Sequence, residues 1–83
     1  MQKLKLTPKQ IRELQEKHQI KNLLNPGDDA PKMATVDFLT DITFEGSRKW
    51  DSPPSKEQVE EFDVGEMLTA TKDFFGGDSS GNA

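Results

Sequence analysis

The segment KMATVDFLTDITFEGSRKW (32–50) decides the fold class, because it fits two kinds of secondary structure. From Val36 to Phe44, apolar residues alternate with other residues, which is typical of a strand. The same segment also has helical spacing, at Met33, Val36, Leu39 and Ile42. It is longer than an ordinary strand and meets no Gly or Pro before Gly46, and no partner strand is recognisable elsewhere. We therefore predict a helix, which its β-branched residues make intrinsically weak.

A second helix is predicted before this segment, from Pro8 to about Gln19. Thr7 is a good N-cap, and Pro8 occupies the first helical position, where its missing N–H costs nothing. Gln10 completes a Thr-x-x-Gln capping box. Pro31 fits the first turn of the central helix, and we expect Asp28 or Asp29 to be its cap.

Two further helices are predicted after the segment. Ser55 and Gln58 form a second capping box, which opens a short helix ending near Phe62. Asp63 and Glu66 form a third, which opens a last helix with Gly76 as its C′ residue. Apolar and small residues of this last helix share one face, at Val64, Met67, Leu68, Thr71, Phe74 and Phe75.

The length and composition limit the protein to one small core. The chain has 83 residues, of which 31% are hydrophobic, and it has no cysteine. We predict an all-α domain over 1–76, a small bundle of about four helices, followed by a flexible, disordered tail over 77–83. No segment resembles a membrane span or a signal peptide, so we expect a soluble cytoplasmic protein.

The charge is unevenly distributed along the chain. The net charge is −4, yet residues 1–24 carry six basic and two acidic residues. The acidic remainder argues against nucleic-acid binding, although the basic first helix leaves a nucleic-acid regulator as an alternative.

Residues for catalysis or metal binding are few. His18 is the only histidine, and we expect it to pack at the edge of the core. Asp37 and Asp41 are four residues apart and would share one helix face, which we expect to be solvated. No nucleophile elbow, phosphate loop or ligand cluster is present, so we expect no enzyme, cofactor or metal site. Trp50 and the Phe74–Phe75 pair instead suggest contacts with another protein.

The order of these features resembles the tail assembly chaperones of long-tailed bacteriophages. The resemblance begins with Leu-Thr-x-x-x-Ile-x-x-Leu (6–14) and continues with an apolar and acidic helix that ends in Phe44-Glu45-Gly46 and a basic cluster. A Pro-containing turn, the Ser55-capped acidic helix and a last amphipathic helix follow. The match covers roughly 5–75 and rests on the order of its motifs.

The resemblance implies a helical chaperone that binds the tape-measure protein and keeps it soluble until tail-tube subunits assemble around it. Such a protein would act in the host cytoplasm and be absent from the mature virion. The expected partners are the tape-measure protein and the tail-tube protein, and self-association is left open. A small structural tail or head-tail joining protein of the virion is the main alternative. The expected contact residues are Leu39, Phe44, Trp50, Met67, Phe74 and Phe75.

Overall fold

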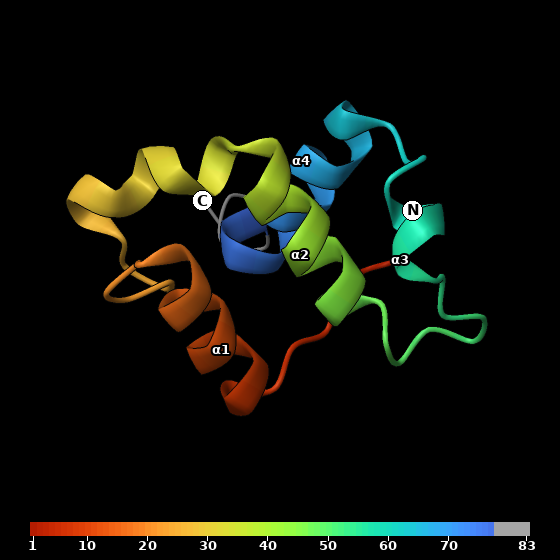
Figure 1. Cartoon of the computed structure of the whole chain (residues 1–83), viewed down its shortest axis with the longest axis horizontal. Coiled ribbons are helices and arrows are strands. Elements are labelled where there is room, and N and C mark those ends of the chain that lie inside the picture. Colours follow the sequence, from red (N-terminus) through yellow and green to blue (C-terminus); the bar gives the residue numbers. More distant parts are fainter. Residues whose placement is uncertain (78–83) are drawn as a thin grey trace.

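The computed structural model describes residues 1–77, and all of the regular secondary structure in that range is helical, which confirms the all-α prediction. Figure 1 shows the arrangement of the elements. Four α-helices are present in residues 1–77, with a 3₁₀ helix between the first two and a π-helical turn after the last. In chain order the elements are α1 (Pro8–His18), η1 (Gly27–Ala34), α2 (Val36–Gly46), α3 (Lys56–Val59), α4 (Val64–Lys72) and η2 (Asp73–Gly77).

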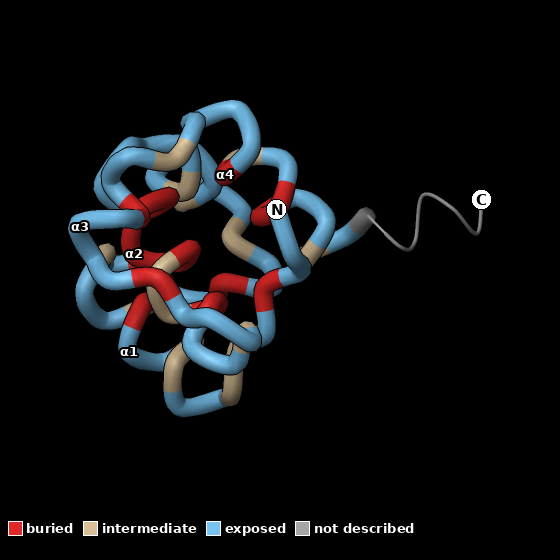
Figure 2. The backbone as a smooth tube through the Cα atoms, turned by 90° about the vertical axis from the view of Figure 1, so that its right-hand side faces the viewer, coloured by how far each residue is buried: buried red, intermediate tan, exposed pale blue. Residues whose placement is uncertain are grey.

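Helix α2 lies at the centre and contacts α1, η1, α3 and α4 (Figure 1). Every residue from Phe38 to Thr43 is buried, so the helix is enclosed on most of its circumference. Figure 2 shows the buried backbone segments facing the middle of the molecule. This position explains the ambiguous pattern of the segment, because a helix buried on most sides needs no single apolar stripe.

Three of the predicted helix starts are confirmed. The side chains of Thr7, Ser55 and Asp63 accept hydrogen bonds from the backbone N–H three residues later. The capping boxes of α1 and α3 are reciprocal, because the glutamine of each box also accepts from the backbone N–H of its cap. These starts were predictable because capping involves neighbours in the chain.

The predicted cap of the central helix is wrong. Residues 27–34 form the 3₁₀ helix, and α2 is capped by Thr35, whose hydroxyl accepts from the Phe38 N–H. Asp29 has a different role, because its carboxylate accepts from the Lys21 N–H at 3.0 Å and pairs with Lys32 at 3.0 Å. The backbone N–H of Lys21 is the main cause of the lowered pKa of Asp29, followed by Lys32.

The ends of the last two helices also differ from the prediction. Helix α3 ends at Val59, and two 3₁₀-type bonds, from Glu61 N–H and Phe62 N–H to the third residue before each, continue the turn. Helix α4 ends at Lys72, and the chain then widens into the π turn that closes at Gly77. Gly77 was predicted to belong to the tail, and the rest of that predicted flexible tail, 78–83, lies outside the described residues.

The N-terminal segment, residues 1–7, is an extended strap that passes behind α2 in Figure 1. Leu4 is buried, and the Lys5 N–H donates to the Gly46 carbonyl at 2.9 Å. The indole N–H of Trp50 donates to the Lys3 carbonyl at 2.8 Å. A Cβ at Gly46 would lie 2.7 Å from the Leu4 Cβ, so only glycine permits this approach.

The strap leads to a prediction for Gly46→Ala. The new methyl group must displace Leu4, at a typical overpacking cost of ~1–3 kcal/mol, and the better helix propensity of Ala returns up to about 1 kcal/mol. We expect a net loss of about 1 kcal/mol and a lower Tm. The fluorescence of Trp50, the single tryptophan, should shift to longer wavelength as the strap loosens. Unchanged Tm and fluorescence would contradict this packing.

A second prediction concerns Thr43, which is fully buried and whose hydroxyl has no hydrogen-bond partner among residues 1–77. Removing an unsatisfied buried hydroxyl while keeping the side-chain shape should be favourable. Thr43→Val is therefore expected to raise the free energy of unfolding by about 1 kcal/mol and Tm by about 4–8 °C. Thr71→Val is the matched control, because the buried Thr71 hydroxyl donates to the Met67 carbonyl at 2.8 Å. The control should show no gain.

Candidate functional site

An open groove of about 630 Å³ lies in the described part of the surface. The end of α1, the first half of α2, and the α3–α4 region all contribute to it. Its polar part contains a carboxylate at Asp41 with cations around it, and its apolar part includes Val36, Phe62, Val64 and Met67. The groove is therefore a candidate binding surface in which charged and apolar groups lie side by side.

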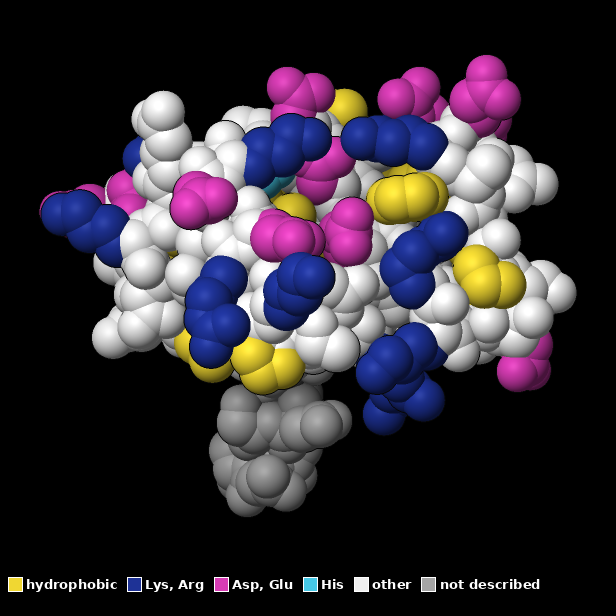
Figure 3. Space-filling model, turned by 60° about the horizontal axis from the view of Figure 1, so that its bottom comes forward, with side chains coloured by type: hydrophobic (Ala, Val, Ile, Leu, Met, Phe, Trp, Pro, Cys, Tyr) yellow, Lys and Arg dark blue, Asp and Glu magenta, His cyan; other side chains and the backbone are white. Residues whose placement is uncertain are grey.

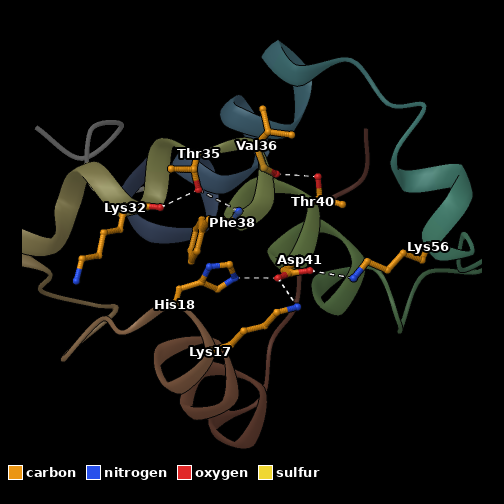
Figure 4. A network of polar contacts seen from close by, with 9 residues as sticks. All are labelled: Lys17, His18, Lys32, Thr35, Val36, Phe38, Thr40, Asp41 and Lys56. Carbon is orange, nitrogen blue, oxygen red and sulfur yellow. Dashed lines mark hydrogen bonds and ion pairs between the residues drawn. The ribbon is translucent and has the colours of Figure 1, made fainter.

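Asp41 is the centre of the polar part (Figure 4). Its Oδ2 accepts from Lys17 Nζ at 2.8 Å and from His18 Nε2 at 2.8 Å. Its Oδ1 accepts from Lys56 Nζ at 3.1 Å. The imidazole of His18 also packs edge-on against the ring of Phe38, with centroids 5.2 Å apart. One carboxylate thus ties α1 and α3 to the central helix.

The electrostatics of Asp41 are a balance of opposing effects. Partial burial favours its neutral form, but hydrogen bonds from Lys17, Lys56 and His18 outweigh this effect and lower the pKa of Asp41 below its ordinary value. The hydrogen bond to Asp41, and then its charge, raise the pKa of Lys17. The carboxylate is therefore ionised at neutral pH, and both of its oxygens accept hydrogen bonds from side chains of the same chain.

The expectation of a solvated face at Asp37 and Asp41 is only half right. Asp37 is exposed, whereas Asp41 is 8% exposed and fully engaged. The ion pairs of Asp41 could not be predicted from the sequence, because the partner side chains belong to α1 and α3. A hint was available, since Asp41 interrupts an apolar run and His18 lies on the apolar side of its own helix. The expected packing of His18 at the core edge agrees with its contact to Phe38.

Two of the six expected contact residues lie in the core. Leu39 and Met67 are each 2% exposed. Leu39 presents no side-chain surface to another protein in this structure, and Met67 reaches the groove at its base. They were chosen from the sequence as apolar helix residues, but the central position of α2 covers Leu39, and the α2–α4 packing covers Met67.

The four aromatic residues of that set are half-buried against the core. Phe44 lies beneath the guanidinium of Arg48, whose carbon is 4.1 Å from the ring centroid. Phe74 and Phe75 meet edge to face, with centroids 4.9 Å apart. Of the six residues, these two are brought together as an aromatic pair near the end of the described chain, and Trp50 is held by the strap.

Sequence analysis also missed the exposed valines of the groove. Val36 is 61% exposed and Val64 is 48% exposed, and both occupy the first position of a helix. The helical spacing predicts that both valines face the core, but the first turn of each helix extends past the core and leaves them exposed. On the face drawn in Figure 3, Lys, Arg, Asp and Glu side chains are interspersed, and hydrophobic side chains form small separate patches.

Comparisons with protein families, with curated proteins and with solved structures found no match. Within residues 1–77, no helix is long and apolar enough to cross a membrane, and no group of three acidic or histidine side chains is placed to hold a metal ion.

Proposed function

We propose that this chain is a non-enzymatic tail assembly chaperone of a long-tailed bacteriophage, which binds the tape-measure protein in the host cytoplasm and keeps it soluble. The observation that supports the proposal is the order of the elements. The Thr7-capped helix, the central helix ending at Gly46, the Ser55-capped helix and the last amphipathic helix all occur at the positions on which the resemblance rests.

The surface chemistry is consistent with this role. The protein is small and acidic, and it has a single thin core. Apolar groups remain at its surface, including the half-buried pair Phe74 and Phe75 and the exposed Val36 and Val64. Such groups suit a helical partner, while the negative charge favours solubility of the complex.

The direct test is co-expression with the tape-measure protein of the same genome, followed by affinity capture and a solubility assay. We expect the tape-measure protein to remain soluble and to co-purify with this chain. If the tape-measure protein precipitates and this chain is instead found in purified virions, the proposal fails and the structural-protein alternative is favoured. Any longer frameshifted product must be co-expressed too, because the short form need not act alone.

The contact residues have their own prediction. We expect Phe74→Ser with Phe75→Ser to reduce capture of the tape-measure protein about tenfold, since aromatic anchors dominate many interfaces. Leu24→Ser is the control, because Leu24 is 70% exposed and lies outside the aromatic pair. Urea unfolding of each variant shows whether the fold is retained. Full capture by a folded double variant would contradict the assignment of these residues.

A further inference from the structure

Two aliphatic side chains stand exposed on the same groove. Val36 projects from the first turn of α2 (Figure 4), and Val64 occupies the first turn of α4. They are among the few large apolar side chains exposed in residues 1–77, and both line the groove. Phe62 and Met67 also belong to the apolar lining. The groove therefore offers apolar contacts, mainly from its two exposed valines, to a partner outside the core.

The charged side chains that line the groove beside these valines have a net negative charge. Lys17 and Lys56, the two lysines of the groove, are both paired with Asp41. Asp37 and Glu60 also line the groove, and the ion pairs found in residues 1–77 include neither of them. The groove lining thus carries three carboxylates against two lysines, and two of those carboxylates, Asp37 and Glu60, lie outside the ion pairs.

The segment that borders the groove on the α3–α4 side strengthens this bias. Residues 57–66 contain no Lys or Arg, and all of their acidic residues are exposed: Glu57, Glu60, Glu61, Asp63 and Glu66. A partner entering the groove therefore meets exposed carboxylates next to valine side chains. Complementary charge on the partner would guide its approach and orient it.

We propose that this groove is the docking site for a basic amphipathic helix of another protein, with an aliphatic stripe on Val36 and Val64 and with Lys or Arg side chains facing Asp37 and Glu60. The groove is open to solvent and not an enclosed cavity, and an open apolar groove is the kind of surface on which an amphipathic helix docks. The inference rests on the proposed function for the helical nature of the partner, and it adds the site and the charge of that partner.

The test uses two synthetic peptides of about 18 residues, long enough to form a helix in isolation. Both carry the same leucine stripe at helical spacing, and one has Lys where the other has Glu. Fluorescence anisotropy measures their binding to the full chain at low and high salt. We expect the basic peptide to bind about tenfold more tightly than the acidic one at low salt, with a smaller difference at high salt.

Matched variants locate the binding site. Val36→Ser and Val64→Ser should each weaken binding of the basic peptide about tenfold, whereas Leu24→Ser should leave it unchanged. Glu60→Lys should weaken binding more than Glu16→Lys, which reverses an exposed charge on α1 outside the groove. The inference is overturned if both peptides bind equally, or if the groove variants behave like their controls. It is also overturned if Val36→Ser converts a dimer to a monomer, because a second copy would then cover the groove.

The same variants separate this inference from the proposed function. If the wild-type chain captures the tape-measure protein and the groove variants capture it equally well, the function stands and the docking site is wrong. If the basic peptide binds in the groove but the wild-type chain leaves the tape-measure protein insoluble, the docking site stands and the chaperone proposal fails.

Discussion

Phe38→Ala is expected to leave the chain largely unfolded at room temperature. The Phe38 side chain is fully buried on the central helix, with the His18 ring against its edge. Truncating a buried phenylalanine typically costs ~3–5 kcal/mol, which is as much as a single core of this size supplies. Far-UV circular dichroism should show the loss of helix, and urea titration should show a weak or absent cooperative transition.

The control for Phe38→Ala is Val36→Ala, two residues earlier on the same helix. Val36 is 61% exposed, so its truncation should change the free energy of unfolding by less than about 0.5 kcal/mol. Similar stabilities for the two variants would contradict the burial pattern of α2. The same reasoning applies to Leu39 and Met67, where a loss of partner binding would report on the fold and not on a contact.

Asp41→Asn is expected to lower the free energy of unfolding by about 2 kcal/mol. The neutral amide loses the ion pairs with Lys17 and Lys56, and its NH₂ group cannot accept a hydrogen bond. The loss stays moderate because the side chains of Lys17 and Lys56 are 61% and 49% exposed, and water can solvate them once the pair is broken. Asp37→Asn is the control, since Asp37 is exposed and the ion pairs of residues 1–77 do not include it. Urea unfolding at neutral pH measures both variants, and equal stabilities would contradict the role of Asp41.

The effect of Asp41 on stability should depend on pH. The pKa of Asp41 is lower in the folded protein than in the unfolded chain, where it is about 3.9, so the unfolded chain binds a proton more readily. The contribution of Asp41 is therefore fully present above about pH 5 and is lost as the pH falls through the folded pKa. The stability difference between the wild type and Asp41→Asn should be constant from about pH 5 to 7 and should shrink below about pH 4. A constant difference down to pH 2 would contradict the ion-pair explanation.

The local features of this protein could be read from the sequence alone. The caps at Thr7, Ser55 and Asp63 act on the backbone three residues away, so their geometry depends on neighbours in the chain. Length favoured a helix for 32–50, and the structure has α2 over Val36–Gly46 of that segment. The start of α2 was placed too early, because Asp29 bonds to Lys21 and Lys32 and does not cap α2.

The candidate site was only partly predictable. The sequence identified aromatic residues at the surface, and Phe74 and Phe75 do form a half-buried pair. It did not separate Leu39 from Val36, because both are aliphatic residues of the same helix. Their exposures, 2% and 61%, depend on which neighbouring elements cover each turn.

The sequence by itself determined the helical class and the first turns of three helices, since these follow from capping and spacing within a few residues. The tertiary structure alone decided that α2 is central and that Leu4 packs against Gly46. It also decided that Asp41 forms ion pairs with lysines at the end of α1 and the start of α3. The physical reason is distance along the chain. Asp41 lies 23 residues from His18 and 15 from Lys56, so only the packing of separate helices brings these groups together.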